Sequence, residues 1–162
     1  MTNQPGVIER VDTILERGET FLVKILLGCQ VLIIFSEIVF RYVLDSSLIW
    51  SEELARYLLV WVAMLGCSIA LSKKGHFGVE ILVNAFPEGI RKCCALLTYV
   101  VMFLFLGTMA AVGTLMVAQA DEVSTVMQMP MRYPYAAIPL GGFLMLFHLF
   151  ALVRRHRLDR LE

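Results

Sequence analysis

The sequence predicts an all-α integral membrane protein with four transmembrane helices and with both termini in the cytoplasm. Three observations predict this fold class: the composition, four apolar stretches long enough to span a bilayer, and the distribution of Lys and Arg. Of the 162 residues, 59% are hydrophobic and only 17% are charged. Soluble domains are on average about half apolar and a quarter charged. A soluble domain of this length could not bury so much apolar surface.

The four apolar stretches cover residues 21–40, 54–71, 95–118 and 135–153. A helix that rises 1.5 Å per residue needs about 20 residues to cross a hydrocarbon core about 30 Å thick. Four helices that are apolar all round would leave most of their faces uncovered in so short a chain, so we expect lipid to cover them. We interpret residues 1–162 as a single membrane domain without internal repeats or linkers.

The orientation follows from the Lys and Arg residues beside the spans, because cytoplasmic flanks carry the excess of positive charge. Eleven of the 14 basic residues precede the first span or, as Lys24, lie near its start, or they lie between the second and third spans or follow the fourth. Only Arg41, Arg56 and Arg132 fall on the opposite side. This bias predicts that both termini and the middle loop are cytoplasmic.

Two shorter segments are predicted to be amphipathic helices that lie in the membrane interface. Over residues 6–17, apolar side chains recur at helical spacing opposite a charged face, and Gly18 is expected to break the helix before the first span. Over residues 77–86, a similar apolar stripe ends at Pro87. In the fourth span, Pro139 is expected to cause a kink, and Gly141 and Gly142 to permit close helix approach.

The densest polar cluster lies at the outer ends of the first two spans. Glu37 and Arg41 are four residues apart, as are Glu52 and Arg56, so each pair can meet on one helix face. Several roles remain open: a charge network that holds the two helices together, a helix cap at Ser51 with acidic residues in the first turn, partner docking, or direct handling of an ion. The cluster consists of Glu37, Arg41, Asp45, Trp50, Glu52, Glu53 and Arg56.

The sequence indicates neither catalysis nor a bound cofactor or metal. The net charge is zero and the basic residues are dispersed, which argues against nucleic-acid binding. No catalytic triad, phosphate-binding loop or clustered set of metal ligands is present, and the four cysteines are interpreted as packing residues. A haem-bearing electron-transfer subunit is one alternative, but His148 lies in a span while His76 lies just beyond the second one, so a second ligand within the membrane is missing.

Several short motifs occur in an order typical of one family of membrane proteins. They are Arg41-Tyr42, Trp50-Ser51-Glu52-Glu53 with Arg56, then Trp61 and Gly66, then His76 with Val79 and Glu80, and finally Ile138-Pro139-Leu140-Gly141 after Pro130 and Tyr133. With these motifs the chain resembles the small permease subunit of tripartite ATP-independent periplasmic (TRAP) transporters, the DctQ-like family. Phe77 departs from the pattern, because an aliphatic residue is usual there.

The resemblance implies a subunit of a bacterial inner-membrane transporter that takes up organic acids. It implies a large permease subunit that carries the transport path and the sodium sites, and a periplasmic substrate-binding protein that docks transiently. The small subunit is then a scaffold without its own substrate site, and its structural or partner-interface candidates are Arg41, Trp50, Glu52, Glu53, Arg56, Trp61, Gly66 and His76. The main alternative is a small self-sufficient proton-coupled exporter that uses Glu37, although this residue lies close to the outer interface with Arg41 beside it.

Overall fold

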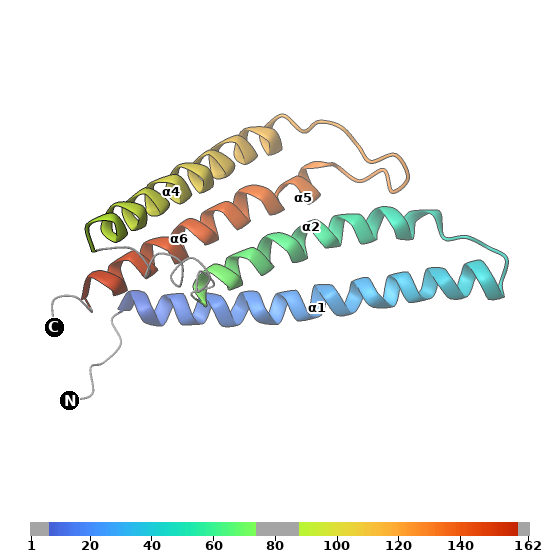
Figure 1. The fold of residues 1–162 in the computed structure, drawn as a ribbon. Helices are drawn as coiled ribbons and strands as arrows, with labels where there is room; N and C mark the ends of the chain where they lie inside the picture. Colours follow the sequence, from blue (N-terminus) through green and yellow to red (C-terminus); the bar gives the residue numbers. More distant parts are fainter. Residues whose placement is uncertain (1–6, 74–87, 159–162) are drawn as a thin grey trace.

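The computed structural model describes residues 7–73 and 88–158, and these residues are mostly helical (Figure 1). The helices are α1 (Val7–Val43), α2 (Ile49–Ser72), α4 (Glu88–Ala118), α5 (Arg132–Tyr135) and α6 (Ala137–Leu158). Four segments are long and apolar enough to cross a membrane: α1, α2, α4, and α5 together with α6. The four predicted spans are thus confirmed as long apolar helices. The interfacial helix predicted over residues 77–86, and His76 before it, lie outside the described residues.

Helix α1 is longer than predicted, because it runs without interruption through Gly18. The predicted break at Gly18, which would have separated an interfacial helix from the first span, is wrong. One glycine inside a helix costs only about 1 kcal/mol relative to alanine. At a rise of 1.5 Å per residue the helix is roughly 55 Å long, so it extends beyond the hydrocarbon core.

Helix α2 begins earlier than its apolar residues indicated, at Ile49, after a tight turn that follows α1. In this turn Asp45 has a φ of 48°, a left-handed conformation that Asp tolerates better than most residues. The cap at Ser51, one of the roles that the sequence leaves open, is not formed. The N-cap residue is Leu48, and the Ser51 hydroxyl donates a hydrogen bond back to the Leu48 carbonyl at 2.6 Å.

The fourth span is divided into α5 and α6 at Ala136, three residues before Pro139. Proline lacks the amide hydrogen that would bond to the carbonyl of Tyr135, and this favours an interruption here. The ladder resumes at once, since the Leu140 amide donates to the Ala136 carbonyl at 3.2 Å. The interruption thus lies on the N-terminal side of Pro139, and the kink expected at Pro139 itself stays a prediction.

The helices pack in the order α1, α2, α6, α4, so that α6 lies between α2 and α4 (Figure 1). Among the described residues, α4 contacts neither α1 nor α2. The glycines of α6 allow the two central contacts. A Cβ atom on Gly141 would lie 2.6 Å from Cε of Met64 on α2, and one on Gly142 would lie 3.2 Å from Cα of Ala110 on α4. The close helix approach predicted for both glycines is confirmed.

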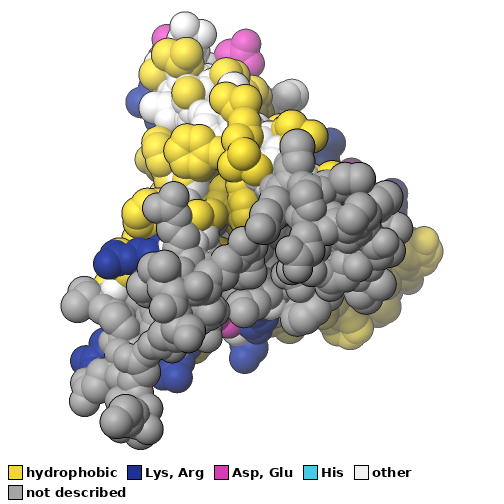
Figure 2. Space-filling model, turned by 60° about the vertical axis from the view of Figure 1, so that its left-hand side comes forward, with side chains coloured by type: hydrophobic (Ala, Val, Ile, Leu, Met, Phe, Trp, Pro, Cys, Tyr) yellow, Lys and Arg dark blue, Asp and Glu magenta, His cyan; other side chains and the backbone are white. Residues whose placement is uncertain are grey.

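The apolar interior is small and lies mainly along α6. Its central cluster consists of Leu71, Leu106, Met145 and Leu149. Large hydrophobic side chains of α1 and α4 are exposed. Figure 2 shows hydrophobic side chains on the surface above and behind the grey residues. Because polar solvent would make so much exposed apolar surface unfavourable, this surface fits a lipid environment.

Candidate functional site

The outer polar cluster predicted from sequence is divided by the structure into internal and exposed parts. Glu37 and Arg41 form the predicted ion pair on α1, at 3.8 Å between Oε1 and Nη1. Trp50, Glu52 and Arg56 are exposed on α2. Within the described residues, neither Glu52 nor Arg56 takes part in an ion pair, so the spacing that allowed them to meet does not bring them together.

Glu53 has a different role from its neighbour, because its side chain is buried and points toward the segment between α4 and α5. One carboxylate oxygen, Oε2, accepts hydrogen bonds from the backbone amides of Val126 and Met127, both at 3.1 Å. The other, Oε1, accepts the hydroxyl hydrogen of Tyr57, one turn further along α2. Tyr57 also lies 3.3 Å from Sδ of Met131. Glu53 therefore fastens the α4–α5 connection to α2.

The segment that Glu53 holds is a compact hairpin over residues 121–131, which we call the outer hairpin. Val123 and Pro130 form an isolated antiparallel bridge, and the Ser124 amide donates to the Met129 carbonyl at 2.8 Å. Gln128 has a φ of 52°, which turns the chain at the tip. A buried carboxylate that accepts two backbone amide hydrogens gives this hairpin a fixed position relative to α2.

The remaining candidates on α2 lie nearer the middle of the membrane. Trp61 is half-buried. Gly66 has no atom within 4 Å of where a Cβ would be, so the structure leaves its surface open. Ala63, Cys67 and Ala70 are exposed around it, and together they place the small-residue seam of α2 on a face that this chain does not cover.

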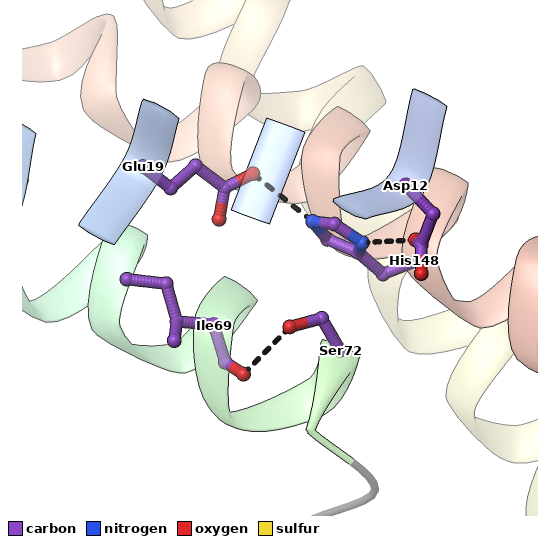
Figure 3. A network of polar contacts seen from close by, with 5 residues as sticks. All are labelled: Asp12, Glu19, Ile69, Ser72 and His148. Carbon is purple, nitrogen blue, oxygen red and sulfur yellow. Dashed lines mark hydrogen bonds and ion pairs between the residues drawn. The ribbon is translucent and has the colours of Figure 1, made fainter. Parts of the chain in front are cut away.

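A second polar site, which the sequence did not predict, joins α1 to α6 at the opposite end of the molecule (Figure 3). His148 on α6 is 1% exposed. Its Nδ1 lies 2.6 Å from Oδ1 of Asp12, and its Nε2 lies 3.0 Å from Oε1 of Glu19. Beside this site, Nζ of Lys73 at the end of α2 lies 3.5 Å from Oε1 of Glu16.

Sequence reasoning missed this site for an identifiable reason. Asp12 and Glu19 are seven residues apart, which places them on the same helix face two turns apart. That spacing is present in the sequence, but the predicted interfacial helix ends at residue 17, so Asp12 is assigned to its charged face while Glu19 lies beyond the expected break at Gly18. The signal that could have found the site is the combination of this spacing with His148, a polar residue inside an apolar span.

The geometry bears on the two alternative functions. Both ring nitrogens of His148 are within hydrogen-bonding distance of carboxylates, which leaves no free ring nitrogen for haem iron. Glu37, which an exporter would need for proton exchange, is paired with Arg41. No group of three or more metal-binding side chains with suitable geometry occurs in the part of the chain that the structure describes. What the polar groups do here is connect helices and a hairpin.

Comparison with known proteins supplies the family. Residues 30–158 match a family model described as tripartite ATP-independent periplasmic transporters, DctQ component. The chain is 36% identical over 119 residues to the sialic acid TRAP transporter permease protein SiaT of Haemophilus influenzae. This match covers 71% of this chain and 19% of that protein. It is 25% identical over 163 residues to the C4-dicarboxylate TRAP transporter small permease protein DctQ of Vibrio cholerae, covering 85% of this chain and 70% of that one.

A third relative is a longer polypeptide. The isethionate TRAP transporter permease protein DctMQ of Oleidesulfovibrio alaskensis is 23% identical over 160 residues, covering 90% of this chain and 24% of that protein. The chain thus spans about a fifth to a quarter of the two longer permeases, and most of the small permease DctQ. The family match covers most of the chain and agrees with its four apolar helices. This chain is a multi-pass inner-membrane protein, not an enzyme, and it belongs to the DctQ family of small permease components of TRAP transporters.

Proposed function

We propose that this chain is a scaffold subunit of a binding-protein-dependent, ion-coupled secondary transporter for organic acids, and that it has no substrate site of its own. The observation that carries the proposal is the match to DctMQ. There, sequence similar to nearly the whole of this chain occupies only 24% of one permease polypeptide. In DctMQ the similar segment is covalently joined to a much larger permease portion and therefore works beside that portion. A separate small chain of the same family would work beside a large permease by associating with it.

The distribution of polar groups supports a scaffold role. Solute carriers usually bind their substrate near the bilayer midplane, between broken helices with exposed backbone groups. Here α1, α2 and α4 are each continuous. Of the buried ionisable side chains among the described residues, Glu53 lies near the start of α2, whereas Glu19 and His148 contact each other nearer the opposite end of the molecule. Between them, the interior is lined by Leu65, Leu106, Ala110 and Met145, and Ser68 adds one buried hydroxyl group.

The proposal includes the orientation predicted from sequence, with both termini in the cytoplasm. The start of α1 and the end of α6 lie at the same end of the molecule, together with the end of α2 and the start of α4 (Figure 1). Figure 2 brings this end forward and shows Lys and Arg side chains beside the grey residues. An excess of basic residues favours the cytoplasmic side. The outer hairpin, held by Glu53, then faces the periplasm, where a soluble substrate-binding protein docks transiently.

The exposed part of the outer cluster is the contact we assign to the large permease subunit. Glu52 and Arg56 lie one turn apart on the face of α2 that this chain leaves uncovered. Further along the same helix, Gly66 and its small neighbours leave room for another helix to approach closely. Charges at the edge of hydrocarbon normally find partners, and within the described residues this chain supplies none for these two.

The experiment that tests the proposal is purification of the tagged chain from its native membrane in mild detergent, with mass spectrometry of the proteins that co-purify. We expect a large multi-spanning permease at equal stoichiometry. Proteoliposomes that contain both subunits should take up an organic acid when the binding protein and an ion gradient are supplied, and liposomes with this chain alone should not. Transport by this chain alone, abolished by Glu37→Gln, would instead establish the exporter.

A further inference from the structure

The buried contact between α1 and α6 has a proton requirement that can be counted from its geometry. A neutral imidazole has one N–H donor and one acceptor nitrogen, whereas an ionised carboxylate only accepts hydrogen bonds. Both ring nitrogens of His148 face carboxyl oxygens at hydrogen-bonding distance, 2.6 Å at Asp12 and 3.0 Å at Glu19. A ring with a single proton would direct its lone pair at one of two ionised carboxylates. The three groups must therefore share at least two protons.

The surroundings make this site sensitive to its charge. The side chains of His148 and Glu19 are 0% and 5% exposed, and Oε2 of Glu19 has no hydrogen-bond partner among the described residues. An unpaired charge in such a site is costly, whereas a carboxylate and an imidazolium offset each other. The other charged or titratable side chains placed at this end are Arg10, Glu16 and Arg17 on α1, Lys73 on α2, Cys94 and Tyr99 on α4, and Arg154 on α6.

We propose that Asp12, Glu19 and His148 form a proton-dependent clamp, in which an imidazolium ring between two carboxylates fastens the N-terminal part of α1 to α6. The position of the clamp explains why it matters for the fold. None of the apolar window of α1 is buried within this chain, and most of the contacts of α1 are with α2. The clamp is a polar connection that ties the start of α1 to the central helix.

The direction of the pH effect follows from the same proton count. When the pH rises and the ring loses a proton, one carboxylate faces a nitrogen lone pair, and the clamp opens. When the pH falls, a protonated carboxyl group can still accept a hydrogen bond from the ring through its other oxygen, so the clamp persists. Stability that depends on the clamp is thus retained on the acidic side and lost on the alkaline side.

The direct test is ¹⁵N NMR of the full chain in detergent with labelled histidine. The chain has three histidines, and the resonances that disappear in His148→Gln identify the buried ring. We expect protons on both ring nitrogens at neutral pH. At alkaline pH, loss of one proton should coincide with lower protection factors, meaning faster amide hydrogen exchange relative to an unprotected amide at the same pH, in the first four turns of α1. A ring with one proton at neutral pH would overturn the proposal, as would loss of that proton without faster exchange.

Variants supply an independent readout, the thermal unfolding midpoint in detergent as a function of pH. His148→Gln should lower the midpoint and remove the clamp's contribution to the alkaline loss of stability, because the buried Glu19 and the partly buried Asp12 are left without a cation. Glu16→Gln is the matched control, since Glu16 lies on the same helix in a more exposed pair with Lys73. Equal midpoints for the two variants would contradict the clamp. If His148→Gln does not fold, the combined variant Asp12→Asn, Glu19→Gln and His148→Gln should restore folding, and its failure would also overturn the proposal.

Discussion

Glu52 and Glu53 are adjacent in sequence, yet their side chains serve different purposes. Glu52 is exposed, whereas Glu53 is 6% exposed and accepts hydrogen bonds from Val126, Met127 and Tyr57. We predict that Glu53→Ala loosens the outer hairpin, because the Val126 amide loses its acceptor and the Met127 amide retains only the Ser124 hydroxyl at 3.2 Å. The amides of Val126 and Met127 should then exchange faster with deuterium, and the thermal unfolding midpoint should fall by several degrees. Glu52→Ala is the control, and identical exchange in the two variants would contradict the role of Glu53.

Helical spacing predicts polar contacts within one helix but not those between distant segments of the chain. Spacing of four residues correctly predicted the pair of Glu37 and Arg41, since both partners lie on one helix. It could not predict the backbone amides that bond to Glu53, which lie 73 and 74 residues further along the chain in a hairpin without helical periodicity. His148 likewise meets Glu19 across 129 residues. Contacts of this kind depend on the packing of the helices, which one sequence does not specify.

At the scale of elements, close packing along α6 depends on single glycines. Gly142 faces the backbone of Ala110 on α4, whereas Gly107 on α4 has no atom within 4 Å of where a Cβ would be. We predict that Gly142→Leu separates α4 from α6 and destabilises the isolated chain by about 1–3 kcal/mol, as overpacking usually does. Gly107→Leu should leave the stability of the isolated chain nearly unchanged. The thermal unfolding midpoint in detergent measures the stability of both variants. Comparable losses of stability in the two variants would contradict a specific role of Gly142 in the α4–α6 contact.

The elements were predictable where hydrophobicity determines them and less so at their ends. Each apolar stretch corresponds to a helix, because a chain in lipid must satisfy its backbone hydrogen bonds within the segment. The helices extend past these stretches into polar sequence, as at the start of α1, where Asp12 and Glu19 meet His148 and Glu16 meets Lys73. These tertiary contacts support a helix through Gly18 that local propensity alone does not favour. The boundaries therefore depend on partners in other helices.

At the scale of the whole molecule, the open order α1, α2, α6, α4 leaves wide faces without protein contacts. The exposed faces of α1 and α4 carry large apolar side chains that lipid can cover. The uncovered face of α2 differs, since it carries Glu52 and Arg56 at one end and small residues around Gly66 further along. This contrast favours the uncovered face of α2 as the surface that contacts another protein.

We predict that Glu52→Gln combined with Arg56→Ala lowers the recovery of the large permease subunit with the tagged chain. The unfolding midpoint of the isolated chain should stay unchanged, because exposed charges contribute only about 0–1 kcal/mol. Arg154→Ala, an exposed arginine at the opposite end of the molecule, is the control and should preserve recovery. A lower midpoint in the double variant would assign Glu52 and Arg56 to the fold of this chain. Full recovery with an unchanged midpoint would instead place the docking surface away from this end of α2, because groups of the large subunit that pair with Glu52 and Arg56 would be left unpaired by the double variant.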